Sequence, residues 1–248
     1  MLSGSITSAA RRGKQCGWSI AWPPGGSGPA ERAELPVVVV LHGRGNDHAS
    51  AFSRRYLALD RFLASVVAGG TAPFALASID GGETYWHARD DGEDAGAMVV
   101  DEFLPLLAGH GLRTDRIGFL GWSMGGFGAL HLARTLGPER VAAVGAMSPA
   151  LWHHFKDTAP GAYDDAEDFA DVDLMGRQDD LAGIAVRIDC GRGDPFLAAS
   201  RDFVHGFEAR PAGGFQRGDH DRGYWRRMAP AQLTFLGSAL EAPANVSA

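Results

Sequence analysis

The sequence predicts one α/β domain with a mostly parallel, doubly wound sheet and helices on both of its faces. Segments of strand type and helix type alternate along the chain, and parallel strands need such crossover connections. The run "LPVVVVLHG" (35–43) is apolar and β-branched, as expected of a strand buried on both faces. A length of 248 residues suits one such domain, and no internal repeat or second core is evident. Residues 1–248 are therefore expected to form a single domain, with 1–16 as a disordered N-terminal segment.

The composition excludes several classes of protein. Hydrophobic residues make up 45% and charged residues 21% of the chain, as in ordinary globular proteins. A formal net charge of -7 without a Lys/Arg block argues against a nucleic-acid partner. No stretch reaches the length of a membrane span, and the N-terminus has no apolar core of a signal peptide, so a cytoplasmic location is expected. The sequence makes no prediction of oligomeric state.

Metal and disulfide chemistry find little support in the sequence. Two cysteines, Cys16 and Cys190, are too few for a disulfide framework or a zinc site, although their pairing stays open. His153, His154 and the aspartates of 164–180 do not match a helical metal-binding spacing. We therefore expect no metal and no cofactor.

The first half of the chain supplies three of the expected strands. The expected elements, in order, are a strand at 17–24, an exposed turn at 25–34, a strand at 35–43, a helix at 56–67, a strand at 73–80 and a helix at 94–111. The helix at 56–67 is amphipathic, and Asp94 is a candidate N-cap for the helix at 94–111. The glycines at 109 and 111 are typical of its end.

The second half continues the alternation but contains one long interruption. The expected elements are a strand at 117–121, a helix at 124–137, strands at 141–149 and 184–191, helices at 195–209 and 224–240, and a polar loop at 210–223. The acidic segment 150–183 is only locally helical. Because long loops inside compact domains are often functional, this insertion is a candidate lid.

The segment "IGFLGWSMGGFGAL" (117–130) raises the question of a nucleophile. Ser123 stands between a strand and a helix, and the glycines at 121 and 125 leave room for a strained turn. This order is typical of a nucleophile elbow, which lifts the serine hydroxyl off the sheet edge. The alternative is a tight helix–sheet contact that only requires small residues.

A serine nucleophile needs a base and an orienting carboxylate, which an α/β-hydrolase places in the order Ser, acid, His. Asp194 follows a predicted strand and is the candidate acid, although it could instead cap a helix that begins at Pro195. Asp189 competes but lies within the strand. His220 is the candidate base, since His42 precedes the serine and His205 falls within a helix.

An oxyanion hole requires two backbone N–H groups. One belongs to Met124, the residue after the nucleophile. The other is expected from the glycine-containing loop "HGRGNDH" (42–48), where Arg44 is the candidate and Gly43 lies beside it. An ordinary glycine turn is the alternative for this loop.

Five segments together resemble the putative esterase branch of the α/β-hydrolases, which includes esterase D-like enzymes and mycolyltransferases. They are "LHGRGNDH", "GGETYWHARDDG", "GWSMGGFGAL", "DCGRGDPF" and "GDHDRGYWRR", and the resemblance runs from about 17 to 238. It implies the α/β-hydrolase fold, a triad of Ser123, Asp194 and His220, and an oxyanion hole at Arg44 and Met124. Secreted transferases of this branch usually carry a leader, and Glu at the acid position. This sequence shows no leader and carries Asp194 at the acid position, so mycolyl transfer is less expected than hydrolysis.

The predicted function is hydrolysis of small-molecule carboxylic esters through an acyl-enzyme on Ser123. An acyltransferase with the same triad, a thioesterase such as an S-formylglutathione hydrolase, and a non-catalytic binding module of the same fold are the alternatives. Four aromatic residues are candidates for the substrate pocket, namely Tyr85, Trp86, Trp122 and Trp152. Arg89 is expected either to anchor a polar leaving group or to pair with the acidic loop "DDGED".

Overall fold

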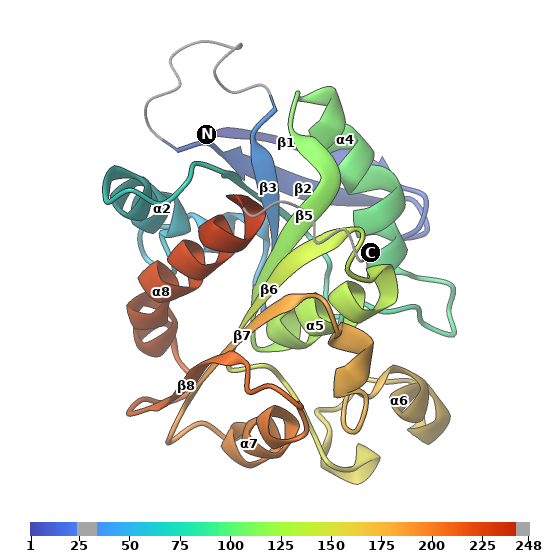
Figure 1. The fold of residues 1–248 in the computed structure, drawn as a ribbon. Helices are drawn as coiled ribbons and strands as arrows, with labels where there is room; N and C mark the ends of the chain where they lie inside the picture. The colour runs from blue at the N-terminus through green and yellow to red at the C-terminus, as the bar shows by residue number, and fades with distance from the viewer. Residues whose placement is uncertain (24–33, 242–248) are drawn as a thin grey trace.

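The computed structural model describes residues 1–23 and 34–241, in which eight strands form one mixed sheet with helices on both faces (Figure 1). The strands lie in the order β1-β2-β4-β3-β5-β6-β7-β8. β2 pairs antiparallel with β1 and β4, and the remaining neighbours pair parallel. The strand bounds are β1 Leu2–Ser8, β2 Lys14–Ala21, β3 Pro36–Leu41, β4 Ala75–Ile79, β5 Arg113–Trp122, β6 Val141–Met147, β7 Ala185–Gly191 and β8 Ala212–Gln216.

Helices fill most of the crossovers between the parallel strands. They are α2 Leu59–Ala68, α3 Ala95–Ala97, α4 Leu104–Gly109, α5 Met124–Leu136, α6 Ala166–Val172, α7 Leu197–His205 and α8 Arg222–Glu241. Shorter helical turns are η1 His48–Ala51, η2 Met98–Phe103, η3 Phe155–Asp157 and η4 Gln178–Leu181. The prediction of a mostly parallel, doubly wound sheet is confirmed.

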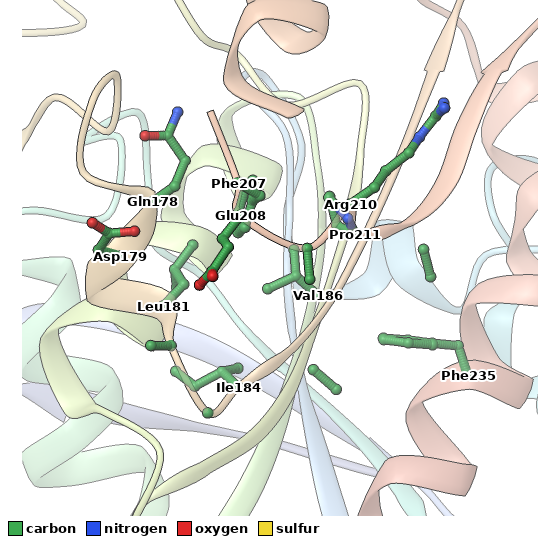
Figure 2. A pocket seen from close by; sticks show the side chains of 15 residues that line it. Gln178, Asp179, Leu181, Ile184, Val186, Phe207, Glu208, Arg210, Pro211 and Phe235 are labelled. Atoms are coloured by element: carbon green, nitrogen blue, oxygen red, sulfur yellow. The ribbon is translucent and has the colours of Figure 1, made fainter. Parts of the chain in front are cut away.

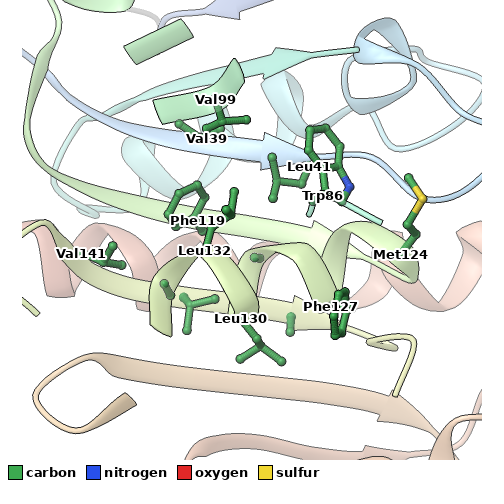
Figure 3. Close-up of a cluster of buried hydrophobic side chains, with 14 of the residues drawn as sticks. Val39, Leu41, Trp86, Val99, Phe119, Met124, Phe127, Leu130, Leu132 and Val141 are labelled. Carbon is green, nitrogen blue, oxygen red and sulfur yellow. The ribbon is translucent and has the colours of Figure 1, made fainter. Parts of the chain in front are cut away.

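The central strand β3 explains why the sheet is covered on both sides. Its side chains alternate, so Val37, Val39 and Leu41 belong to the buried cluster that includes α4 and α5, whereas Val38 and Val40 belong to the cluster that includes α2 and α8. Figure 3 shows the first of these clusters, with Val39 and Leu41 facing residues of β5 and α5. Burial of each such side chain contributes about 1.5 to 3 kcal/mol.

The sheet reverses its direction of growth beside β3. The chain passes from β3 to β4 on one side and then to β5 on the other. In open α/β sheets, ligand sites form at such a switch point, outside the carboxyl ends of the strands. The loop 42–48 follows β3 and Ser123 follows β5, so both candidate segments lie at this point of the sheet.

The expectation of a disordered segment at 1–16 is wrong. These residues form β1 and the beginning of β2, in a hairpin that pairs Leu2 with Ile20 and Ser8 with Lys14. β1 is an edge strand with mostly exposed, serine-rich positions, so its sequence lacks the apolar alternation of a half-buried strand. Only tertiary pairing with β2 makes it a strand.

The predicted loop at 210–223 contains a strand, β8, which sequence reasoning missed. Its sequence "AGGFQ" includes two glycines, a residue type that is depleted in strands. The glycine at 213 has a φ of 95°, and a Cβ there would overlap the backbone of Ile188 on β7. Close approach of the two backbones therefore requires the residue that obscured the strand.

The other expected elements differ mainly at their ends. The helix at 94–111 is one helical run from α3 through η2 to α4, with Asp94 capping it by accepting from the Ala97 N–H. The segment 150–183 contains only the short turns η3 and η4 and the two-turn helix α6. The exposed turn expected at 25–34 lies outside the described residues except for Glu34.

Candidate active site

Ser123 sits in a strained turn between β5 and α5. Its φ of 55° and ψ of -122° are rare for a residue with a side chain. Cβ atoms at the two flanking glycines would overlap backbone, that of Gly125 for Gly121 and that of Leu41 for Gly125. Glycine is therefore required on both sides, and the sequence signature of an elbow corresponds to an elbow in the structure.

The turn is fixed by backbone hydrogen bonds. The Ser123 N–H donates to the Met147 carbonyl at 3.0 Å, and the Ser123 carbonyl accepts from the Ala150 N–H at 3.0 Å. Gly126 and Phe127 of α5 also donate to that carbonyl, at 2.9 and 3.1 Å. These bonds stabilise the strained conformation and leave the side chain to face the loops beyond the sheet.

His220 joins Ser123 to Asp194. Its Nε2 lies 2.9 Å from Ser123 Oγ, and its Nδ1 lies 2.9 Å from Asp194 Oδ2. Because the carboxylate accepts from Nδ1–H, the lone pair on Nε2 faces the serine hydroxyl. The three side chains thus have the hydrogen-bond connectivity of a serine, base and acid.

Asp194 is held as a carboxylate beneath His220. Its side chain has no exposed surface, and Oδ1 accepts from the Phe196 N–H at 2.9 Å. Burial favours the neutral acid, but the hydrogen bonds from His220 and the Phe196 N–H outweigh it and hold the pKa of this carboxyl below its ordinary value. The alternative role as a helix cap is realised only in part, because α7 begins at Leu197 and its N-cap is Phe196.

Two aromatic rings fix the orientation of the imidazole. Phe196 and Trp225 present their rings to His220 at centroid distances of 5.2 and 5.1 Å, with interplanar angles of 68° and 89°. The His220 side chain remains 25% exposed, so a substrate can reach it from the open side. Edge contacts of this kind restrain the ring without consuming its nitrogens.

The competing acid and base have other partners. Asp189 is fully buried and pairs with Arg187 at 2.8 Å, while Gln232 donates to it at 3.0 Å. His42 is also fully buried, and its Nε2 accepts from the Gly81 N–H at 3.0 Å. Burial lowers the pKa of His42, so this ring is a neutral structural group.

The candidate oxyanion donors lie on the two segments that flank the switch point. Met124 is the first residue of α5, where helix geometry leaves the N–H without an intrahelical acceptor. The Arg44 N–H has no acceptor among the residues that the structure describes. The preceding carbonyl, that of Gly43, is held by His42 Nδ1 at 2.9 Å and by the Asn46 N–H at 3.2 Å. These bonds fix the peptide plane that carries the Arg44 N–H.

Two of the four aromatic pocket candidates do not line an open surface. Trp86 and Trp122 have no exposed area. Trp122 donates from Nε1 to Asn46 Oδ1 at 3.0 Å, and Trp86 donates to the His42 carbonyl at 3.3 Å. Their rings support the loop 42–48 from below. The prediction that they border a pocket is therefore corrected, because residues adjacent to a site in sequence can point into the core.

The other two candidates belong to an aromatic wall beside the triad. Trp152 is partly exposed, and its ring centroid lies 5.6 Å from that of Tyr85 and 5.2 Å from that of Phe196. Tyr85 itself is 3% exposed. Phe196 in turn contacts His220. Sequence reasoning missed Phe196 as a wall residue, although it stands two positions after the candidate acid.

The segment 150–183 is attached to the loop that follows β4. Arg89 donates to both carboxylate oxygens of Asp164, and its Nη1 donates to the Ala162 carbonyl at 3.0 Å. His87 Nε2 lies 3.2 Å from the same carbonyl. Arg89 thus pairs with the candidate lid. It was expected to anchor a polar leaving group or to pair with the acidic loop "DDGED", and this contact is neither of the two. Tyr163 of the same segment has its ring centroid 5.9 Å from that of Tyr85 and 6.0 Å from that of Trp152, so the segment borders the aromatic wall.

A separate cavity of about 350 Å³ lies at the other end of the sheet (Figure 2). It is lined by Val186 near the start of β7, by Pro211 just before β8 and by Phe235 of α8. Parallel strands place their ligand sites at their carboxyl ends, so this cavity is remote from the candidate chemistry.

The described residues show neither a metal cluster nor a membrane helix. Within 1–23 and 34–241, no group of three or more His, Cys, Asp or Glu side chains could hold a metal ion. In the same part of the chain, no helix combines the length and the apolar character that crossing a bilayer requires. Cys16 and Cys190 are both free thiols.

The fold and the serine elbow define an α/β-hydrolase. The sequence profile of the family described as "Putative esterase" matches residues 13–236. The chain belongs to this family and is an esterase. Among curated protein sequences, none matches this chain.

Solved structures share the fold over nearly the whole chain. A ferulic acid esterase is 21% identical with a TM-score of 0.80, and the match covers 96% of this chain and 98% of the other. An S-formylglutathione hydrolase from Agrobacterium tumefaciens is 19% identical with a TM-score of 0.76, covering 96% and 94%. The fluorophosphonate-binding serine hydrolase FphF of Staphylococcus aureus is 19% identical with a TM-score of 0.74, covering 95% and 97%.

Proposed function

We propose that the protein hydrolyses carboxylic esters through an acyl-enzyme on Ser123, with His220 as the general base and Asp194 as the acid that orients it. The observation that carries this proposal is the position of the His220 ring, whose two nitrogens lie 2.9 Å from Ser123 Oγ and 2.9 Å from Asp194 Oδ2. A base aligned on both sides in the resting enzyme is preorganised for proton transfer.

The first half of the reaction acylates the serine. As Ser123 Oγ bonds to the carbonyl carbon, its proton passes to His220 Nε2 and the carbonyl π electrons move onto oxygen. The resulting oxyanion accepts from the N–H groups of Arg44 and Met124. When it collapses, the bond to the leaving oxygen breaks, and His220 delivers its proton to that oxygen. The products are an alcohol and an ester of Ser123.

The second half repeats these steps with water. His220 removes a proton from water, the hydroxyl bonds to the acyl carbon, and the proton returns to Ser123 Oγ as the carboxylic acid leaves. Asp194 stabilises the imidazolium that forms in each half. One backbone donor in an oxyanion hole contributes roughly 10²- to 10³-fold in rate.

Trp152 and Phe196 are the surfaces that a substrate would meet beside the triad. Both are apolar, and Phe196 also contacts the base. We therefore place the apolar part of the ester along this wall. A thioester would follow the same steps with a thiolate as leaving group, and acyl transfer would replace water with an alcohol.

The test measures hydrolysis of p-nitrophenyl esters from acetyl to palmitoyl, with intact-mass detection of an acyl adduct. Ser123→Ala is the diagnostic variant, and Ser65→Ala, an exposed serine on α2, is the matched control. We expect turnover and a single adduct in wild type and in Ser65→Ala, and neither in Ser123→Ala. An adduct that persists in Ser123→Ala would overturn the assignment of the nucleophile. Turnover of acyl-thioesters alone would redirect it to thioester hydrolysis.

A further inference from the structure

Four arginines, called here the arginine cluster, gather where α8 begins beside the loop that precedes α2. Arg222 and Arg226 of α8 donate from Nη1 to that loop, Arg222 to the Arg55 carbonyl at 2.9 Å and Arg226 to the carbonyls of Arg54 and Tyr56 at 3.2 and 3.1 Å. These bonds hold Arg54 and Arg55 against the helix, on the face where α2 and α8 pack together (Figure 1). In a chain with a formal net charge of -7, such a concentration of positive charge needs an explanation.

The arginine cluster has no counter-charge. Among the residues that the structure describes, none of the four arginines forms an ion pair. Arg54 and Arg55 are exposed, and within the same residues their side chains make no hydrogen bond either. Arg222 and Arg226 are like charges four positions apart on one helix, a spacing that costs stability. Folding therefore does not account for these charges.

The arginine cluster adjoins the candidate active site. The loop before α2 follows β3, and α8 follows the loop of His220, so both lie at the edge of the sheet where the strands end. The ring centroid of Tyr56 lies 5.9 Å from that of Trp122 and 6.3 Å from that of Trp225. The Trp225 ring lies 5.1 Å from that of His220. Two ring contacts thus connect Tyr56, the residue after Arg55, to the proposed base.

The two aromatic contacts of His220 lead to surfaces of different chemistry. Phe196 leads to Trp152 and the apolar wall, where the acyl chain is placed. Trp225 leads to Tyr56 and the arginine cluster. Because His220 delivers its proton to the leaving oxygen, the alcohol part of the ester begins beside this ring. With the acyl chain on the wall, the alcohol part extends toward Trp225 and the arginine cluster.

We propose that the arginine cluster binds an anionic group, a carboxylate or a phosphate, on the alcohol part of the ester. This inference rests on the proposed function and narrows its substrate to an apolar acyl ester of an alcohol that carries an acidic group. Arg54 and Arg55 make the contact, because a guanidinium presents paired N–H donors that match two oxygens of such an anion. Arg222 and Arg226 hold the loop and add to the positive potential.

The test compares two esters that differ in charge on the alcohol part alone. They are the butyryl ester of para-hydroxyphenylpropionate and the butyryl ester of its neutral primary amide. At low ionic strength, kcat/KM of wild type should favour the carboxylate on the order of tenfold. This preference should fall to near one at about 1 M salt, where the Debye length is about 3 Å. The ethyl phosphate analogue of the same phenol shows which of the two anions is preferred.

The diagnostic variant is the double substitution Arg54→Gln and Arg55→Gln. It should lower the carboxylate-to-amide ratio of kcat/KM roughly tenfold, and the loss should appear in KM rather than in kcat. The matched control is Arg113→Gln with Arg140→Gln. These arginines are exposed at the amino ends of β5 and β6, at the opposite end of the sheet, so the control makes the same change in net charge. The control should keep the ratio of wild type.

The outcomes separate this inference from the proposed function. If wild type is labelled at Ser123 by a fluorophosphonate but hydrolyses the carboxylate no faster than the amide, this inference alone is wrong. An equal fall of the ratio in both double variants would also overturn it, since net charge would then account for the preference. If wild type is neither labelled nor active on either ester, the proposed function itself fails, and this inference fails with it.

Discussion

Asp194 binds the imidazole of His220 through one carboxylate oxygen and the Phe196 N–H through the other, each at 2.9 Å. The acid is thereby tied to the base and to the turn that leads into α7. Phe196 also places its ring 5.2 Å from His220, so the residue that anchors the acid touches the base directly. Small movements of this turn would therefore change the alignment of both groups together.

Asp194→Asn should reduce kcat by about 10³- to 10⁴-fold with little change in fold. The amide has a similar shape but no charge, so it cannot stabilise the imidazolium or select the required tautomer. The measurement is ester turnover with circular dichroism as a check on folding. Asp219→Asn, an exposed neighbour of His220, is the matched control and should retain activity. Equal losses in the two variants would contradict the role of Asp194.

The lowered pKa of Asp194 predicts a stability difference that depends on pH. The pKa of this carboxyl in the folded protein lies below its ordinary value of 3.8. The carboxylate therefore stabilises the fold at pH values above 3.8, and this stabilisation is lost as the pH falls through the pKa of the folded state. The difference in unfolding free energy between wild type and Asp194→Asn should thus be constant near neutrality and shrink below about pH 4. Urea denaturation across this range measures it. A difference that grows with acidity would show that the pKa is raised instead.

Gly125→Ala should prevent folding or destabilise the protein by about 3 kcal/mol or more, because the added Cβ would overlap the Leu41 backbone, which cannot move aside. Gly109→Ala provides the control. This glycine ends α4 and has open space around its Cβ position, so alanine should be neutral or stabilise by up to about 1 kcal/mol. Chemical denaturation compares the two. Similar unfolding free energies in both variants would argue against the close approach.

Trp152→Ala and Trp122→Phe should have different effects. Trp152 is partly exposed beside the triad, so its loss should raise KM roughly tenfold for long acyl chains and hardly at all for acetyl esters. Trp122 is fully buried and donates to Asn46, so phenylalanine should lower stability and kcat at every chain length. Kinetics over the p-nitrophenyl ester series distinguishes these patterns. If KM in Trp122→Phe also changed with acyl chain length, the conclusion that Trp122 lies outside the substrate pocket would be wrong.

Asp164→Asn should loosen the attachment of the candidate lid. The variant removes the charge that Arg89 contacts, and a partly exposed ion pair contributes about 1 kcal/mol or less, so amide exchange near 161–164 should quicken roughly two- to fivefold. Hydrogen exchange with mass spectrometry measures this change. Asp180→Asn, an exposed position of the same segment, should leave the exchange unaltered. Unchanged exchange in Asp164→Asn would show that other contacts hold the segment.

The alternation of strands with helices and the chain order of Ser123, Asp194 and His220 could be predicted because both depend on local sequence patterns. The β-branched run 37–40 is typical of a strand buried on both faces, and glycines around Ser123 indicate a strained turn. β1 and β8 were not readable, since one is an exposed edge and the other carries two glycines for a contact with β7.

The aromatic residues show a second limit of sequence reasoning. Trp86 and Trp122 lie next to the site in the chain but point into the core, because the direction of a side chain depends on strand register and loop geometry.

The chain order of the proposed triad has a consequence for protein synthesis. Ser123 leaves the ribosome first, Asp194 follows, and His220 comes last, on the loop between the edge strand β8 and α8. A nascent chain that has emerged only as far as β7 carries the nucleophile with neither its base nor the helix α8 that covers β5, β6 and β7. Hydrolytic competence is therefore acquired at the end of translation, so unfinished chains would carry no active esterase.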